Sequence, residues 1–495
     1  MLFNTAEYIL FFIVVTVVYF TLPKRIRYIW LLAASYFFYM NWSVKYSLLL
    51  LSSTLVTWLS SLLIDKYRNN IKLSKTIVTV CIVFNLALLG VFKYTTFILD
   101  NINKIIRVTG KNGLDYIWNF ALPVGISFYI FQALSYTVDV YRKDVQIEKN
   151  FLKYALFVSF FPQLVAGPIE RSSNLLRQIQ NIHKESCINF DRMIRGTIVV
   201  IWGLFMKMVI ADRIAIFVDA VFDKYYLYGS VELILAAIGF AIQIYCDFAG
   251  YSTIAIGSAE ILGFSLMDNF KAPYLSGSVK EFWRRWHISL STWFRDYLYI
   301  PLGGSRCSVI KKYMNIFITM SVSGLWHGTN WSYVVWGGLH GIYQIVEDSM
   351  KNISSAIVKK YNVKTNVFSF WLLKRVVTFI LVDFAWIFFR ASGVREAANI
   401  ISRIFTRINP WVLFDKSLYN IALDYTEVHI LVIALLVMLL VDAIQYVRDV
   451  RIDEIVLSQN LWFKWLFIVV FITVIWVLGI YGPAFNSSQF IYFQF

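Results

Sequence analysis

Apolar runs of about 20 residues recur along nearly the whole chain, and that length is what an α-helix needs to cross a bilayer. Clear examples are residues 44–64 and 462–481. Only 15% of the 495 residues are charged, whereas soluble domains carry about 25%. The runs therefore predict an all-α polytopic membrane protein, because a soluble fold cannot cover so many apolar helices.

Positive charge is concentrated in short segments between the apolar runs. The formal charge is +16 and the pI is near 9.4. This balance suits nucleic-acid binding, but Lys and Arg also collect in the cytoplasmic loops of membrane proteins. The second interpretation fits better, because the basic segments 23–27 and 65–75 each follow a span. We expect an outside N-terminus, no nucleic-acid partner, and a basic cytoplasmic face for membrane lipids or an anionic donor such as a coenzyme A thioester.

The runs predict one transmembrane domain, 1–495, with about 11–13 membrane segments. It comprises N-terminal spans (1–145), a core with the catalytic region (146–345), C-terminal spans (346–481) and an outside aromatic tail (482–495). Residues 100–116 read as an outside loop. Two prolines and a glycine in 151–168 predict broken backbone, either re-entrant or a simple proline kink. The four cysteines form no CxxC pair, so we expect no disulfide framework and no metal site.

The stretch 280–341 is too polar for a span and too aromatic for a solvated loop. It holds three of the five histidines, His287, His327 and His340. Helical spacing predicts one amphipathic helix at the cytoplasmic interface, ended by the Pro and Gly residues after 300. Its apolar stripe consists of Phe282, Trp286, Leu290, Trp293 and Tyr297. The chain then returns into the membrane over 314–336.

Histidine at membrane depth is a functional hypothesis, because neutral imidazole can take a proton from a hydroxyl near neutral pH. GxSxG, HxxxH and HExxH patterns are absent, which leaves direct transfer from a thioester. A histidine would activate a hydroxyl. Arg284, Arg285 and Arg295, with Trp326 or backbone N–H groups, would bind the donor phosphates or the oxyanion.

Each of these residues also has a structural interpretation. For His327 a core histidine is about as plausible as a catalytic one. A solvated face leads for His287, and a structural role leads for His340. Asp247 lies inside a predicted span, where a carboxylate is costly. We expect it to pair with one of the central arginines rather than to take part in chemistry.

EFWRRWHISLSTWFRDYLYIPLGG followed by SGLWHG closely resembles the membrane-bound O-acyltransferase family, in its bacterial branch of alginate O-acetyltransferases. LPVGISFYIFQALSYTVDVYR, FFPQLVAGPIER and QIYCDFAGYSTIAIGSAEILGF resemble the same branch, in its order. The resemblance implies helices around a central funnel and partition, with His327 catalytic and His287 as the second characteristic position. It also implies a bacterial cytoplasmic-membrane location and acetyl transfer to an envelope or exported polysaccharide.

The resemblance further implies acetyl-CoA as donor, no permanently bound cofactor, and an extracytoplasmic partner transferase of the SGNH type, similar to AlgJ or AlgX. Two alternatives stay open: D-alanyl transfer from a carrier protein to teichoic acid, and a transporter of an acyl or glycan carrier. The transporter interpretation predicts inverted repeats, and none is evident.

The tail ends FIYFQF, with Tyr492 among phenylalanines. Related acylation systems place a similar aromatic motif at the outer funnel, so Tyr492 is a possible acyl relay. An aryl ester stays activated because a phenol leaves more readily than a sugar hydroxyl. The structural alternative is an aromatic anchor at the membrane interface.

Overall fold

The computed structural model describes residues 1–110, 114, 122–165, 167–184, 188–481 and 491. All regular structure in these residues is helical, which confirms the predicted fold class. The chain divides into two compact units, one of residues 1–197 and 255–267, the other of residues 198–254 and 268–495. The boundary falls within two long helices, α10 and α12.

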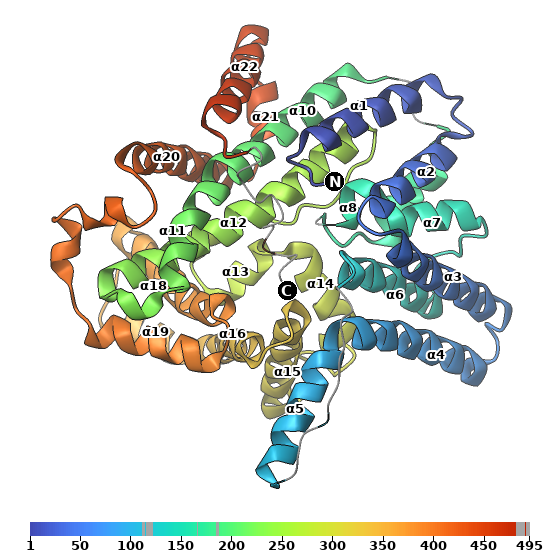
Figure 1. Cartoon of the computed structure of the whole chain (residues 1–495). Coiled ribbons are helices and arrows are strands. Elements are labelled where there is room, and N and C mark those ends of the chain that lie inside the picture. The colour runs from blue at the N-terminus through green and yellow to red at the C-terminus, as the bar shows by residue number, and fades with distance from the viewer. Residues whose placement is uncertain (111–113, 115–121, 166, 185–187, 482–490, 492–495) are drawn as a thin grey trace. The chain divides into compact units, whose positions relative to one another are not determined.

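The first unit consists of the helices drawn in blue to green in Figure 1. These are α1 (Ala6–Thr21), α2 (Arg27–Met40), α3 (Val44–Lys66), α4 (Ile71–Leu89), the π-helix η1 (Gly90–Tyr94), α5 (Thr95–Val108), α6 (Ile126–Arg142), α7 (Phe151–Ser159), α8 (Phe161–Leu164), η2 (Ser172–Leu176), α9 (Arg177–Gln180) and the first half of α10 (Phe190–Leu204). The last turns of α12 (Ser230–Ile261) complete the unit.

Hydroxyl side chains on α3 join this unit together. Ser53 donates to Asn85 of α4 at 2.6 Å, and Thr57 accepts from Tyr154 of α7 at 2.8 Å. All four side chains are buried. Small and hydroxyl residues are typical of helix contacts in membranes, where apolar surface alone gives helices no reason to associate.

The structure of this unit tests two of the predictions made from the sequence. The outside loop expected from residue 100 is wrong over its first part, because Asp100 continues helix α5 to Val108 and the span runs from Ile71 to Val108. The expected break in 151–168 is confirmed, since Phe160 separates α7 from α8. The N–H of Phe161 that the break leaves without a helical acceptor donates to Ser35 Oγ at 3.1 Å.

The second unit contains the remaining elements. These are the end of α10, the π-helix η3 (Phe205–Ala211), α11 (Asp212–Phe222), η4 (Tyr225–Leu227), most of α12, η5 (Pro273–Leu275), α13 (Val279–Arg285), α14 (Ile288–Phe294), the π-helix η6 (Arg295–Tyr299), α15 (Val309–His327), α16 (Trp331–Ser349), α17 (Lys351–Lys360), α18 (Phe368–Arg390), α19 (Val394–Thr406), η7 (Pro410–Leu413), η8 (Ser417–Asn420), α20 (Tyr425–Arg448), α21 (Ile452–Leu457) and α22 (Leu461–Leu478).

Three expectations for this unit need correction. The single amphipathic helix is broken into α13 and α14 at Trp286 and His287. The membrane segment 314–336 is a hairpin instead, since α15 ends at His327 and α16 begins at Trp331. Figure 1 shows these two helices side by side. Residues 447–459, which the sequence predicts to be a charged loop between the last two spans, contain the short helix α21.

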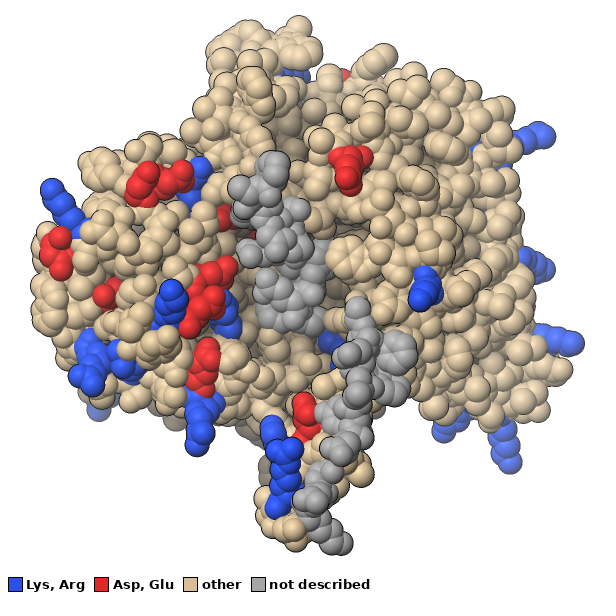
Figure 2. All heavy atoms as spheres, in the orientation of Figure 1, with Lys and Arg blue, Asp and Glu red and all other residues tan. Residues whose placement is uncertain are grey.

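Six helices of the described residues are long and apolar enough to cross a membrane, with α1 a shorter apolar helix. The number is below the predicted 11–13 segments, because helices such as α15, α16 and α18 are short or carry charged residues. Figure 2 shows that much of the surface over α1–α4 carries no charged side chain, and that Lys and Arg project at its edge. The chain is a multi-pass membrane protein.

Candidate active site

His287 occupies the break between α13 and α14. Ser278 caps α13 by accepting from the Glu281 N–H at 3.1 Å, and the helix ends at Arg285. His287 then adopts a left-handed conformation, φ 44°, which is uncommon for any residue with a Cβ. The reversal is held by backbone pairing, because the Ile288 N–H donates to Asn269 O at 2.9 Å and the Lys271 N–H to Arg285 O at 3.0 Å.

A buried polar cluster surrounds one face of the imidazole. Asn269 Oδ1 lies 3.1 Å from His287 Nδ1 and accepts from the Ser289 N–H at 3.3 Å and from its hydroxyl at 2.9 Å. All three side chains are at most 1% exposed. Sequence reasoning passed over Asn269, which lies outside the quoted motifs, and over Ser289, which lies within EFWRRWHISLS but was given no role.

Aromatic rings cover the rest of His287. Its ring centroid is 4.6 Å from that of Phe248 in an edge-on contact, and 6.4 Å from that of Phe270. The expectation of a solvated face is therefore wrong. Because burial disfavours the charged form, the pKa of His287 is lowered to about 3. The side chain is neutral at physiological pH.

His327 lies at the end of α15, where the chain turns toward α16. Asn330 caps α16 by accepting from the Ser332 N–H at 3.1 Å. The His327 ring is buried and lies 4.9 Å from Trp326, 5.1 Å from Trp336 and 5.5 Å from Phe389 between centroids. It is 6.3 Å from the ring of His287. The two predicted histidines, forty residues apart in the chain, are thus brought together.

Glycines allow the hairpin that carries His327 to close tightly. A Cβ at Gly324 would lie 2.1 Å from the Tyr333 carbonyl oxygen, and one at Gly337 would lie 2.2 Å from that of Met320. Real Cβ atoms do not approach backbone so closely. The separation of α15 and α16, and with it the position of His327, depends on these glycines.

His340 lies within α16 and has the structural surroundings that the sequence predicted for it. The side chain is completely buried. Its ring stacks at 6.1 Å on Phe282 and meets Trp283 and Trp336 edge-on at 5.2 and 5.1 Å. It therefore belongs to the aromatic packing behind the two site histidines.

Asp247 has a different partner from the predicted arginine. It pairs with Lys207 at 2.6 Å, and Lys207 also pairs with Asp212 at 2.7 Å. All three side chains are at most 4% exposed. Asp247 Oδ2 also accepts from the backbone N–H of Ile491 at 2.8 Å. The predicted arginine partner is therefore wrong, and Lys207 of the π-helix η3 takes its place. Tyr492 lies outside the described residues.

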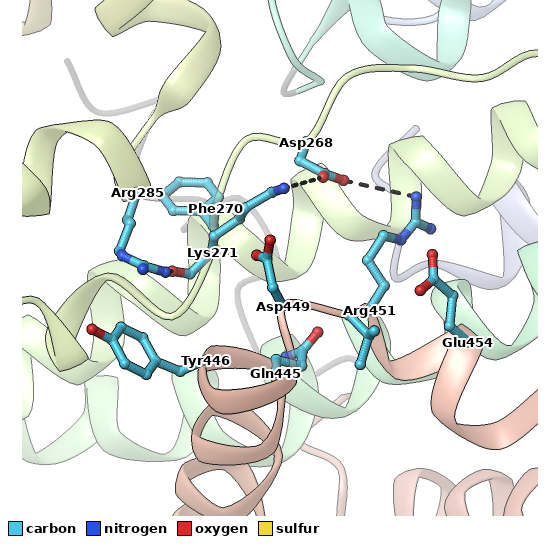
Figure 3. A pocket seen from close by; sticks show the side chains of 10 residues that line it. Asp268, Phe270, Lys271, Arg285, Gln445, Tyr446, Asp449, Arg451 and Glu454 are labelled. Atoms are coloured by element: carbon cyan, nitrogen blue, oxygen red, sulfur yellow. Dashed lines mark hydrogen bonds and ion pairs between the residues drawn. The ribbon is translucent and has the colours of Figure 1, made fainter.

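A pocket of about 130 Å³ lies beside the segment that carries Asn269 (Figure 3). Asp268 bridges Lys271 and Arg451 across it, at 3.3 and 3.7 Å. The remaining lining residues are Phe270, Arg285, Gln445, Tyr446, Asp449, Val450 and Glu454.

Of the three arginines predicted to bind the donor, Arg285 lines this pocket. It pairs with Glu281 at 3.0 Å and lies over the Tyr446 ring at 4.3 Å. Arg284 is exposed, and so is Arg295, which pairs with its neighbour Asp296 at 2.7 Å. Arg284 and Arg285 are in the last turn of α13, before the break, whereas Arg295 begins η6 after it.

Comparison with known proteins gives one consistent result. Residues 126–394 match the profile described as MBOAT, membrane-bound O-acyltransferase family. The chain is 36% identical to the probable alginate O-acetylase AlgI of Pseudomonas putida over 91% of its own length and 89% of that protein. It is 33% identical to the peptidoglycan O-acetyltransferase of Helicobacter pylori over 81% of this chain and 79% of that one. Identity to the teichoic acid D-alanyltransferase of Bacillus subtilis is 27%, over 54% of this chain and 68% of that one.

Proposed function

The chain belongs to the membrane-bound O-acyltransferase family and is a multi-pass membrane O-acyltransferase, and from this premise we propose that it transfers acetyl groups for O-acetylation of an envelope or exported polysaccharide. The donor is acetyl-CoA on the cytoplasmic side of the bacterial cytoplasmic membrane. Acetyl is favoured over D-alanyl because the relatives named as acetylases match far more of the chain than those named as D-alanyltransferases.

The observation that carries this proposal is the pair of buried histidine rings, 6.3 Å apart. In the proposed reaction His327 is the general base and takes the proton of an attacking hydroxyl. The new C–O bond forms at the thioester carbonyl, the C–S bond breaks, and the proton passes to the departing thiolate. His287 orients the reacting groups. The Trp326 ring packs against the rings of both histidines and excludes water from the site.

Replacement of His327 by Ala tests this assignment. The variant should lose acetyl transfer by at least about a hundredfold, as expected when a general base is removed, while its amount in the membrane stays normal. His429→Ala is the matched control, since His429 is exposed on α20. Normal polymer acetylation in cells carrying only His327→Ala would contradict the assignment.

The phosphate groups of acetyl-CoA are proposed to enter the pocket lined by Arg285, Lys271 and Arg451. Three carboxylates in the same lining balance these three cations. We therefore expect a phosphate group to bind between Lys271 and Arg451, where it would replace the Asp268 carboxylate as the ion-pair partner of both cations.

Loss of one pocket cation should weaken donor binding more than turnover. Arg451→Gln is expected to raise KM for acetyl-CoA about tenfold, about 1.4 kcal/mol, with kcat nearly retained. Arg306→Gln serves as control, because Arg306 is exposed and does not line the pocket. An unchanged KM in Arg451→Gln would place the donor elsewhere.

Tyr492 is proposed to carry the acetyl group as an aryl ester before a separate extracytoplasmic transferase of the SGNH type passes it to the polymer. The preceding residue supports this. Ile491 is buried, and its backbone N–H donates to the Asp247 carboxylate. Asp247 is followed in sequence by Phe248, whose ring contacts that of His287. Intact mass spectrometry should find an acetyl-sized adduct on the C-terminal peptide of wild-type protein. It should be absent from Tyr492→Phe and His327→Ala. Full polymer acetylation by Tyr492→Phe would contradict the relay, and the tail would then act only as an anchor at the membrane interface.

A further inference from the structure

The hydrogen-bonding role of His287 is set by the group opposite its Nδ1. A backbone N–H can only donate, so the atom of Asn269 that faces the Ser289 N–H is its amide oxygen and not its nitrogen. The same oxygen lies 3.1 Å from His287 Nδ1. Since an amide oxygen only accepts, the hydrogen of the neutral imidazole is on Nδ1 and the lone pair is on Nε2.

We propose that Asn269 is a positioning residue that holds His287 in its Nδ1–H tautomer, so that Nε2 accepts a hydrogen bond from the incoming hydroxyl as it binds. The same O–H then turns to His327, whose ring centroid lies 6.3 Å from that of His287, and His327 takes the proton as the hydroxyl attacks. This rests on the proposed function and names the group that His287 orients. A neutral ring in this tautomer has no Nε2 hydrogen to donate to a thioester carbonyl. His287 therefore recognises a proton donor, and a hydroxyl is the donor in this reaction.

The local fold makes this arrangement rigid. The main chain of Asn269 is fixed by the bond from the Ile288 N–H to its carbonyl, at 2.9 Å. Its side chain is fixed by the two bonds from Ser289. Because His287 and Ser289 flank Ile288, one asparagine contacts three successive residues at the break. The left-handed backbone of His287 thus places Nδ1 against an acceptor that does not move.

The surroundings keep His287 neutral. The rings of Phe248, Phe270 and Trp326, which carry no titratable group, lie against it, and the His327 ring lies 6.3 Å away between centroids. Among neighbouring carboxylates, Asp247 is paired with Lys207, and Asp268 with Lys271 and Arg451. With its pKa lowered to about 3 by burial, His287 stays an acceptor throughout the physiological pH range.

Magic-angle-spinning NMR of the membrane-reconstituted protein, labelled with ¹⁵N in its five histidines, tests the tautomer directly. The pair of signals lost in His287→Gln belongs to His287. We expect a protonated Nδ1 and an unprotonated Nε2 at neutral pH. A protonated Nε2, or an imidazolium, would overturn the proposal. This measurement needs no substrate, so it decides the tautomer even if wild-type protein transfers no acetyl group, a result that would contradict the proposed function instead.

The isosteric change Asn269→Asp tests the consequence for catalysis. A carboxylate opposite Nδ1 stabilises the imidazolium and raises the pKa of His287 by about 1–3. His287 must be unprotonated to accept, so the acid limb of kcat/KM, which in wild type is set by the general base His327, gains a second protonation, becomes steeper and moves to higher pH. The variant is therefore slow near pH 5 and recovers toward pH 7, a range where wild-type His287 does not titrate.

Ser289→Ala is the matched control, because it removes one bond to the same oxygen and keeps the bond to His287. Its acid limb should stay at the wild-type pH even if its stability falls. A purely structural role for Asn269 predicts lower stability in Asn269→Asp with an unmoved acid limb, and that outcome would overturn the proposal.

Discussion

At the scale of single residues, Lys207 is the group on which the interior of the second unit most depends. It lies between Asp212 and Asp247, at 2.7 and 2.6 Å, and is 3% exposed. A buried charge is expensive unless it is paired, and here one cation serves two carboxylates. The second of these carboxylates also holds the Ile491 N–H, so the pairing reaches the C-terminal segment.

Replacing Lys207 by Met should destabilise the protein by about 3–5 kcal/mol, the usual cost of removing one partner from a buried pair. The side chain keeps its length, but two carboxylates then repel each other in an apolar interior. Thermal unfolding in detergent would show this as a lower Tm. Lys351→Met, at an exposed position of α17, should leave Tm unchanged. Equal Tm values for the two variants would mean that the triad adds nothing to stability.

Residue types made His327 and His287 candidates, because histidine within an apolar chain is unusual, but they left a core role as plausible for His327 and favoured a solvated face for His287. The family resemblance is what pointed to a role in chemistry for both. Reasoning from residue types failed for Asn269, whose contact with His287 depends on a chain reversal between residues 269 and 287. It also chose the wrong partner for Asp247. Such pairings between distant segments depend on tertiary packing, and the spacing of residues along one helix contains no information about it.

At the scale of elements, the α15–α16 hairpin determines where His327 lies. Its two helices meet backbone to backbone at Gly324 and Gly337, the kind of small-residue contact common between membrane helices. The sequence predicted one continuous segment over 314–336, which contains Gly324 and ends just before Gly337. Asn330, which caps α16, is the signal that could have separated the two helices.

Neighbouring glycines on α16 provide a matched test. In Gly337→Ala the new methyl group would meet the Met320 carbonyl oxygen at 2.2 Å, so the helices must separate. In Gly338→Ala it would lie 3.5 Å from the Phe317 ring, an ordinary contact. We expect acetyl transfer to fall about tenfold or more in the first variant, as reactive groups are misplaced. The second should keep its rate and gain up to about 1 kcal/mol from helix propensity. Similar rates in both would show that the hairpin tolerates separation.

The broken central helix explains another failure of periodicity. The stripe from Phe282 to Leu290 is buried as expected. However, the left-handed turn at His287 changes the direction of the chain, and beyond it Trp293 and Tyr297 are only half-buried. A hydrophobic stripe can continue across a break in a helix when both pieces pack on the same core. Periodicity alone therefore does not exclude such a break.

At the scale of the whole molecule, composition and apolar runs were sufficient for the fold class and for spans such as 44–64 and 462–481, which correspond to α3 and α22. They were less reliable for the number of spans, because several helices of the second unit are short or carry charge and do not read as ordinary spans. The alternation of basic segments predicts that the N-terminus and the end of α22 lie outside, with residues 23–27 in the cytoplasm.

Cysteine labelling would test this orientation. In a background without the four native cysteines, an impermeant maleimide should label Tyr481→Cys in intact cells. It should label Lys24→Cys only after the membrane is permeabilised, because positive charge retains that loop in the cytoplasm. Both positions are solvent-accessible in the folded chain. Labelling of Lys24→Cys in intact cells would invert the predicted orientation.

The ion pairing of Lys207 has a consequence for biosynthesis. The segment around Lys207 leaves the ribosome well before Asp247, which lies forty residues later in the chain. Until then the lysine has only Asp212, in the same helix, as its partner. Although the helix is apolar enough to cross a membrane, a lysine with an incomplete set of partners is costly in lipid, so we predict that the translocon retains the segment until α12 arrives. The two helices would then enter the bilayer together, and a ribosome stalled between them should leave a segment that alkaline carbonate still extracts.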